Sequence, residues 1–288
     1  MAIQVDNSFV RDYVDDFKHI FQRRGGILRP TVRTKTNVIG YSTTFQRIGK
    51  GSASSKARHG VITPMNQDHD PIECVLSDKY AGDYVDRLDE LKIQHSERQA
   101  ILEGGLFACG RTIDDQIIVA MDATSQTAVT FDETSEATVR NSLIGVAKAL
   151  NANEVPNDGK RFAALTANAW AMAETVEEFG SADFVMPDGR PFNEGAPFPM
   201  FRRWLGILWT NHQGLPAAGA ASGAKGFAWH SDAVGYGLGA EITADISWVG
   251  PRAAHWLMHY FSGGACLIDD TGVIEIDIGD DTTVLPTT

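Results

Sequence analysis

The sequence contains few cysteines, and their spacing does not suit metal or redox chemistry. Its 288 residues include only Cys74, Cys109 and Cys266, and none of them lies in the C-x-x-C spacing that zinc sites and redox motifs use. Three cysteines cannot all pair within one chain. We therefore expect buried free thiols and a reducing compartment.

Long apolar runs and the common catalytic motifs are also missing. The chain has no run of roughly eighteen apolar residues, so no membrane span and no membrane partner are expected. Its first residues lack the charged and apolar regions of a secretory signal, and none is expected. Neither G-x-S-x-G nor a glycine-rich dinucleotide signature is present. These absences predict a protein with no catalytic residue, no bound cofactor and no enzymatic activity.

Two groups of residues that include histidines are candidates for a metal site. His255 and His259 are four residues apart and would share one face of a helix, but the sequence between them lacks the glutamate of the zinc-protease motif. A second group lies in or near a predicted loop and comprises His59, Asp68, His69 and Asp70. Neither pattern is sufficient to predict a metal. A soluble metal-dependent enzyme using one of these regions remains an alternative.

Charge is distributed unevenly along the chain. Residues 1–60 hold 11 basic and 4 acidic residues, which leaves 14 of the 25 basic and 33 of the 37 acidic residues for the remainder. The net charge is therefore +7 for the first part and −19 for the second. A basic end can bind nucleic acid or dock on the acidic body of a neighbouring copy. The strongly acidic remainder favours docking between copies.

The basic end has the pattern of a long β-hairpin. Residues 31–48 are rich in residues that favour strands, residues 61–62 and 71–76 are candidates for a return strand, and residues 49–60 between them are polar and flexible. A two-stranded hairpin is marginally stable alone in water, so it needs another surface. We therefore expect its basic side chains to contact the acidic surface of a neighbouring subunit; these are Lys50, Lys56 and Arg58.

Two helices are predicted on either side of this hairpin. Aromatic residues recur at spacing four over residues 8–24, which indicates a helical stripe. A longer helix begins at the cap residue Ser96 and ends near Ala123, with apolar or small residues at helical spacing. Its interior glycines weaken it by roughly 1 kcal/mol each and predict a bend or a close approach by another segment; they are Gly104, Gly105 and Gly110.

The C-terminal part shows an ordered series of shorter elements. We predict a strand at 226–230, a turn or helix at 231–239, a strand at 241–249 and a helix that Pro251 opens and Gly263 closes. A hairpin with a turn at 269–272 follows, and its residues 273–278 alternate as in a half-buried strand.

This order of elements resembles the C-terminal region of tailed-bacteriophage major capsid proteins, which have the Hong Kong 97-like capsid fold. Residues 137–156 resemble the helix and N-x-x-V-P loop of those proteins. Residues 161–185 look like the strand and helix that follow, and residues 197–216 look like the next strand segment. The resemblance covers most of the chain and rests on the order of several weak segments.

The resemblance implies an α+β capsid fold and a structural function. It implies an N-terminal arm (1–30), an extended β-hairpin loop (31–80), a peripheral domain with a long spine helix (81–130 and 263–288) and an axial domain (131–262). The chain would assemble in the host cytoplasm into hexamers and pentamers of a virion head. Double-stranded DNA would be packaged inside without sequence specificity, with scaffold, portal and decoration proteins as possible partners. An encapsulin-like nanocompartment shares the fold and is the alternative.

Overall fold

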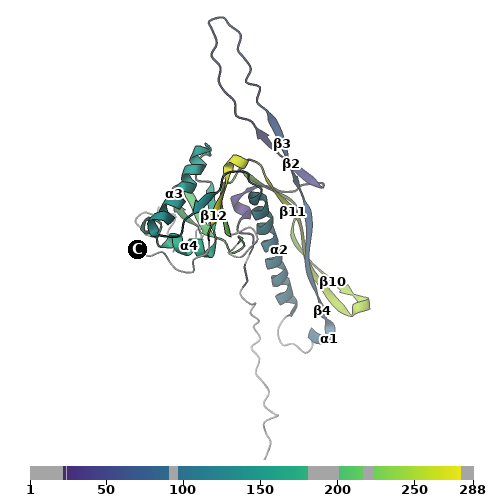
Figure 1. The fold of residues 1–288 in the computed structure, drawn as a ribbon. Helices are drawn as coiled ribbons and strands as arrows, with labels where there is room; N and C mark the ends of the chain where they lie inside the picture. The colour runs from purple at the N-terminus through teal and green to yellow at the C-terminus, as the bar shows by residue number, and fades with distance from the viewer. Residues whose placement is uncertain (1–21, 24, 91–96, 181–200, 217–223, 280–288) are drawn as a thin grey trace, which may run out of the picture.

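The body of the molecule consists of two sheets with a long helix between them, and a third, two-stranded sheet projects from it (Figure 1). The computed structural model describes residues 22–23, 25–90, 97–180, 201–216 and 224–279. The long helix, α2 (Glu97–Asp122), confirms the helix predicted from residue 96 to 123. Its buried positions follow the predicted helical spacing and include Cys109, Ile113, Ile117 and Met121.

The first sheet has six strands in the order β5-β12-β9-β6-β8-β7. Its strands are β5 (Val129–Phe131), β6 (Arg161–Leu165), β7 (Arg202–Trp204), β8 (Ile207–Asn211), β9 (Ala224–His230) and β12 (Val273–Ile278). Helix α3 (Glu136–Ala152), with α4 (Ala167–Glu174) and the short α5 (Glu177–Gly180), packs on one face. These elements confirm the helix, strand–helix unit and strand segment predicted between residues 137 and 216.

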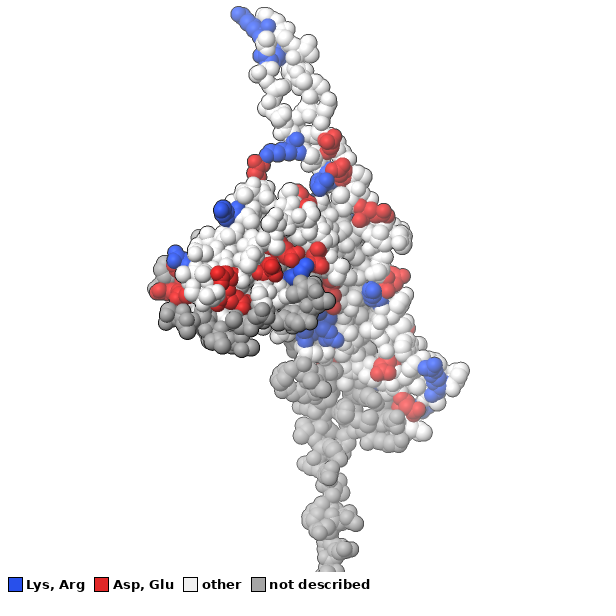
Figure 2. All heavy atoms as spheres, in the orientation of Figure 1, with Lys and Arg blue, Asp and Glu red and all other residues white. Residues whose placement is uncertain are grey.

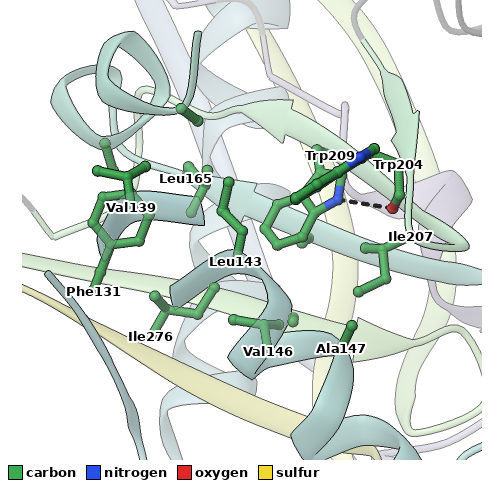
Figure 3. Packing of buried hydrophobic residues seen from close by; sticks show 14 of the residues in the cluster. Phe131, Val139, Leu143, Val146, Ala147, Leu165, Trp204, Ile207, Trp209 and Ile276 are labelled. Carbon is green, nitrogen blue, oxygen red and sulfur yellow. Dashed lines mark hydrogen bonds between the residues drawn. The ribbon is translucent and has the colours of Figure 1, made fainter. Parts of the chain in front are cut away.

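Apolar side chains fill the space between this sheet and its helices (Figure 3). Leu143 and Val146 of α3 meet Trp209 and Ile276 of the sheet, and all four side chains are fully buried. The indole Nε1 of Trp209 donates a hydrogen bond of 3.1 Å to the carbonyl of Trp204, which satisfies its polar atom inside the core. The opposite face of the sheet packs on α2 through Phe227 and Trp229, so the sheet is buried on both sides.

The second sheet has four strands in the order β1-β10-β11-β4. They are β1 (Arg33–Lys35), β4 (Ser77–Asp86), β10 (Val234–Val249) and β11 (Ala254–Leu267). β10 and β11 form a long antiparallel pair, and α2 lies along β11 and β4. Strand β10 therefore lies in one sheet with β4, next to the long helix α2.

A two-stranded sheet projects from the body (Figure 1). Strands β2 (Ser42–Ile48) and β3 (His69–Val75) are antiparallel, with Ser42 opposite Val75 and Ile48 opposite His69. The predicted hairpin is therefore present. Its first strand is shorter than the predicted 31–48, because residues 33–35 form β1 in the other sheet, and residues 61–62 are not in a strand.

The predicted helix over residues 251–263 is wrong. Pro251 lies in a short 3₁₀ turn, η3 (Gly250–Arg252), and the residues that follow form strand β11. Buried Leu257, His259 and Phe261 alternate with less buried neighbours, which is the period of a strand. Gly263 pairs within that strand and does not cap a helix.

Two further predictions for the C-terminal part need correction. Residues 231–239 form a turn only up to residue 233, and β10 begins at Val234 because its small residues fit a crowded sheet. The turn predicted at residues 269–272 is present as η4 (Asp270–Gly272), but β11 and β12 belong to different sheets and do not form a hairpin. The alternation predicted for residues 273–278 is confirmed by burial of all three isoleucines. The helix predicted over residues 8–24 lies almost entirely outside the described residues.

Asp270 joins the end of α2 to the turn before β12. Its carboxylate accepts hydrogen bonds from the Ser125 backbone (2.8 Å) and from the side chains of Thr124, Ser125 and Gln126. Burial by itself raises the pKa of Asp270, but these hydrogen bonds outweigh it and lower the pKa from 3.8 to about 2. The carboxylate thus stabilises the fold when it is ionised.

This pKa predicts a particular response to acid. Because the folded pKa is depressed, the stabilisation is complete above about pH 4 and is lost as the pH falls towards 2. We expect Asp270→Asn to lower the melting temperature at neutral pH, and the gap between variant and wild type to close between pH 4 and pH 2. Thermal unfolding of the unassembled protein across this range measures it. A gap that stays constant down to pH 2 would contradict the assignment.

Candidate assembly surfaces

The outer part of the hairpin, residues 49–68, has few hydrogen bonds that could fix its shape in the single chain. Its limbs are joined at the base, where Gly49 N donates to the Asp68 carbonyl (2.8 Å) and Gln67 Nε2 donates to the Gly49 carbonyl (3.1 Å). At the tip, Gly60 N donates to the Ala57 carbonyl (2.9 Å), and His59 has a positive φ of 67°. Between these points the limbs are mostly exposed.

Large apolar side chains on and beside the hairpin face solvent in the single chain. Val61 is 94% exposed, Ile39 99% and Tyr41 74%, with Ile48, Ile62 and Met65 also exposed. Scattered apolar residues are normal on protein surfaces, but so many on one thin projection indicate a surface that another molecule covers.

Basic side chains gather at the outer end of the hairpin, and acidic side chains dominate the body face shown (Figure 2). Lys56 and Arg58 lie in the exposed outer loop, as predicted from sequence. Lys50 lies nearer the base and forms an ion pair with Glu154, in the loop after α3 of the same chain. Hydrogen bonding from Lys50 and its positive charge lower the pKa of the Glu154 carboxyl. Lys50 is therefore paired within its own chain and lies apart from Lys56 and Arg58.

The base of the hairpin rests in a groove that glycines form on β10 and β11. A Cβ atom added to Gly235 would lie 2.8 Å from the Phe45 ring, and one added to Gly237 would lie 2.9 Å from Thr43. At Gly264 the added atom would lie 2.1 Å from the carbonyl oxygen of Val75. Real Cβ atoms do not approach other atoms so closely. We call these three glycines the glycine groove; they fix where the hairpin leaves the body.

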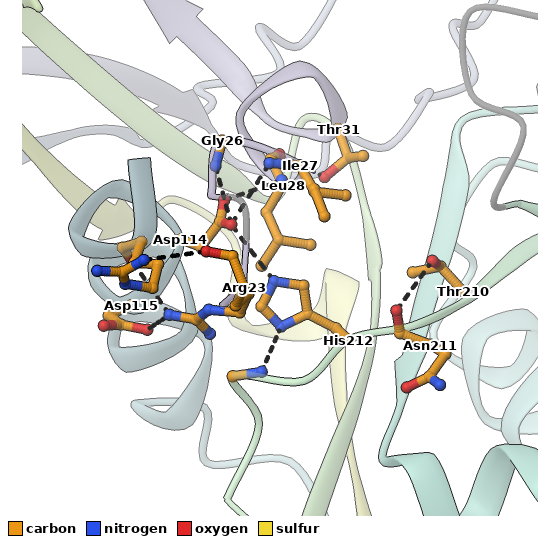
Figure 4. Close-up of polar contacts among 12 residues, drawn as sticks. Arg23, Gly26, Ile27, Leu28, Thr31, Asp114, Asp115, Thr210, Asn211 and His212 are labelled. Atoms are coloured by element: carbon orange, nitrogen blue, oxygen red, sulfur yellow. Dashed lines mark hydrogen bonds and ion pairs between the residues drawn. The ribbon is translucent and has the colours of Figure 1, made fainter. Parts of the chain in front are cut away.

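A second fixed point holds residues 25–28 against α2. Asp114 of α2 is fully buried, and its carboxylate accepts backbone hydrogen bonds from Gly26 (3.0 Å), Ile27 (3.4 Å) and Leu28 (3.0 Å) (Figure 4). A Cβ atom on Gly110 would lie 3.0 Å from the Gly25 backbone. This confirms, at Gly110, the close approach predicted from the glycines inside the helix.

A histidine completes the surroundings of Asp114. His212, in the segment after β8, is buried, and its Nε2 lies 3.4 Å from the Asp114 carboxylate. Its Nδ1 accepts a hydrogen bond from Gly214 N (3.2 Å), so Nε2 carries the proton that points to Asp114. One carboxylate therefore joins residues 26–28, α2 and the segment that follows β8 of the six-stranded sheet.

The sequence predicted neither the glycine groove nor Asp114. The glycines 235 and 237 alternate with bulkier residues, which is a strand pattern with small side chains on one face. Asp114 interrupts the buried stripe of α2, and an acidic residue in such a stripe is a signal for a buried partner. Both signals are present in the sequence, but they do not identify the partner residues, which lie 86 or more residues away.

The two histidine groups do not come together as metal sites. His255 and His259 lie on one strand, about 13 Å apart along it. His255 packs on Trp248 with ring centroids 4.8 Å apart, whereas His259 is buried beside Gly105, and burial lowers its pKa. Asp70 pairs with Arg47 at 2.9 Å. Across the described ranges, no group of three or more His, Cys, Asp or Glu residues is placed to hold a metal ion. No helix in those ranges is long and apolar enough to cross a membrane.

Comparisons with known proteins agree with this architecture. The family model for phage capsid proteins matches residues 5–279. The capsid structure of the cyanophage P-SCSP1u is similar with a TM-score of 0.73 and 15% identity, covering 96% of this chain and 95% of that chain. The capsid of a native gene transfer agent particle (GTA) gives a TM-score of 0.69 at 10% identity, covering 96% and 97% of the two chains. A Mycobacterium phage Cain structure gives 0.66 at 14% identity, covering 98% of both. Among curated protein sequences, none matches significantly.

The fold is therefore an α+β fold of the phage-capsid type, and it fits the Hong Kong 97-like architecture. The chain belongs to the phage capsid protein family, since the family match spans nearly its whole length. It is a structural component of the virion, the major capsid protein of a tailed phage, and it self-assembles. The encapsulin-like compartment and the metal-dependent enzyme are not favoured.

Proposed function

We propose that this chain assembles into hexamers and pentamers of an icosahedral head around double-stranded DNA, and that the hairpin makes a principal contact between subunits. The observation that carries the proposal is the contrast within the hairpin. Its base is locked into the glycine groove, whereas its outer part exposes Val61, Ile62 and Met65 to solvent. A rigidly placed projection with exposed apolar side chains suits docking on a neighbour. Because its base is already fixed, little further conformational entropy is lost when it binds.

The proposal divides the structure by role. The six-stranded sheet with α3 and α4 supplies the axial part, and α2 with the four-stranded sheet supplies the peripheral part. On this division β10 and β11 belong to the peripheral part, unlike the boundaries expected from sequence, because they pair with β4 along α2. Residues 26–28, at the end of the proposed N-terminal arm, are held by the Asp114 contact. No enzymatic step is required for any of these roles.

Assembly in the host cytoplasm fits the three cysteines, which are free thiols. The enclosed DNA would be held without sequence specificity, because the net charge of −12 opposes strong binding to phosphates. Scaffold, portal and decoration proteins would complete the head.

Charge reversal tests the hairpin contact. Lys50, Lys56 and Arg58 are the basic residues proposed for it, but Lys50 is already paired within its own chain. We expect Lys56→Glu with Arg58→Glu to reduce particle yield several-fold, since each exposed ion pair contributes about 0–1 kcal/mol and the loss repeats in every subunit. The defect should be largest at low salt, where electrostatic contacts are strongest. Sucrose-gradient yield and negative-stain microscopy measure the effect, with any required scaffold supplied.

Lys50 provides a matched comparison. If its role lies within the chain, Lys50→Glu should impair the protein mildly, and Glu154→Lys in the same chain should rescue it. The triple variant adds Lys50→Glu to the double variant. Its further loss of particle yield should then be no larger than the loss that Lys50→Glu causes by itself. A normal yield from the double variant at low salt would show that the tip makes no electrostatic contact.

A further inference from the structure

Two of the three cysteines lie together where the hairpin meets the body. Cys74 is near the end of β3 and is fully buried, whereas Cys266 on β11 is partly exposed. The thiol of Cys74 donates to the Gly264 carbonyl at 3.2 Å, and the two thiols share a hydrogen bond. They come from segments far apart in the sequence, since Cys74 and Gly264 are 190 residues apart.

The surroundings hold the two sulfur atoms on one face of the sheet. Cys266 is opposite Gly235 in the antiparallel pair, and Gly264 is opposite Gly237 two residues further along. A Cβ atom added to Gly237 would lie 3.5 Å from the Cys74 sulfur. Phe45 and Ile268 cover the pair as a small apolar cluster. The thiols therefore face each other within the glycine groove, away from Cys109 in α2.

The environment also favours reaction between them. Hydrogen bonding from the Cys266 thiol lowers the pKa of Cys74 to about 7, against the opposing effect of burial. The same hydrogen bond and burial raise the pKa of Cys266. One thiolate is thus available near neutral pH, next to a thiol that solvent reaches.

We propose that Cys74 and Cys266 form a redox-sensitive pair that closes into a disulfide when the protein meets a small-molecule disulfide. In the first step Cys266, whose sulfur is the more accessible one, passes its proton to the Cys74 thiolate and attacks the small disulfide, forming a mixed disulfide and releasing one small thiolate. In the second step Cys74 gives this proton to the small thiolate just released, and its sulfur attacks the Cys266 sulfur and releases the second small thiolate. Overall, one cysteine S–H bond and the oxidant's S–S bond are broken, one protein S–S bond and one small-molecule S–H bond are formed, and the negative charge of Cys74 leaves on the second small thiolate.

The disulfide would attach β3 covalently to β11 and make the hairpin base a permanent part of the sheet. In a reducing cytoplasm the pair stays open, so the hairpin base is held by packing alone. In an oxidising medium it closes. The inference concerns the single chain and does not depend on what the chain assembles into.

Peptide mapping tests the pair directly. Protein carrying Cys109→Ser, so that only the pair remains, is incubated with oxidised glutathione, alkylated and digested without reductant. We expect most Cys74 and Cys266 to be recovered in one cross-linked peptide that a reductant separates. The melting temperature should rise by roughly 5–10 °C on oxidation and return on reduction, because a cross-link closing a long loop restricts the unfolded chain.

The single variants are the controls. Cys74→Ser should leave Cys266 as a stable glutathione adduct, and Cys266→Ser should leave Cys74 unmodified because it is buried. The inference is overturned if oxidised protein carries glutathione on Cys266 with Cys74 still free, if both cysteines are alkylated separately, or if Cys266 links to Cys266 of another copy. None of these results would bear on shell assembly, which particle yield measures independently.

Discussion

Replacing Asp114 by alanine is expected to destabilise the protein by about 3–5 kcal/mol, as for the loss of one member of a buried polar network. The carboxylate accepts three backbone hydrogen bonds and faces the His212 ring, and the site is closed to solvent. Its removal leaves these donors without their acceptor, and the Leu28 N–H among them is buried. Since a domain is stable by only about 5–15 kcal/mol, much of the chain would be unfolded or aggregated.

Asp114→Asn keeps the experiment informative if the alanine variant does not fold. The amide has the same shape, but its nitrogen cannot accept from Gly26 or Leu28, so we expect an intermediate loss of stability. Urea unfolding of the unassembled protein measures both variants. Asp115→Ala is the matched control, since Asp115 is adjacent, lies on the exposed side and pairs with Arg23 at 2.6 Å. Exposed pairs contribute about 0–1 kcal/mol, so the control should stay near the wild type. An Asp114→Ala protein as stable as the control would show that residues 26–28 are held by packing alone.

Sequence patterns predicted those elements that local periodicity determines. The helix α2 and the α3 region have long stripes at helical spacing, and the hairpin has strand composition on both sides of a polar loop. Strand β11 was predicted as a helix because Pro251 and Gly263 resemble helix-end signals, whereas the alternation of buried residues 257, 259 and 261 is a strand signal. The helix-end signals and the strand alternation are both present in this segment. Its pairing with β4 and β10 determines that it is a strand.

The parts that fix the assembly surfaces depend on contacts between distant residues, and sequence could not supply them. Gly235 and Gly237 lie in the segment 231–239, which was predicted as a turn or helix, and only the structure shows Phe45 and Thr43 against them. Lys50 looks like the other basic residues of the loop until Glu154 is found beside it. What the sequence did predict was that the hairpin needs another surface, because a two-stranded hairpin is marginally stable alone.

Substitution of Gly264 is expected to separate the hairpin base from the sheet. A Cβ atom at this position would lie 2.1 Å from the Val75 carbonyl oxygen, and that oxygen belongs to backbone, so it cannot rotate away as a side chain can. Either β3 moves outwards or β11 distorts. Overpacking of this kind costs about 1–3 kcal/mol or more. For Gly264→Ala we therefore expect particle yield to fall at least tenfold, because about 1.4 kcal/mol per contact is already a factor of ten.

A series of alanine substitutions along the same strand pair separates this effect from a general effect of removing glycine. At Gly235 the new Cβ atom would meet the ends of the Phe45 and Ile268 side chains at 2.8 and 2.9 Å, which can shift, so Gly235→Ala should be milder than Gly264→Ala. At Gly250, in the turn at the far end, the nearest atom would be 4.0 Å away, so Gly250→Ala should assemble normally. Particle yield and the melting temperature of the unassembled protein should follow this order. If all three variants assembled equally well, the base of the hairpin would have to be free to move on the sheet, and the fixed projection on which the docking proposal rests would be lost.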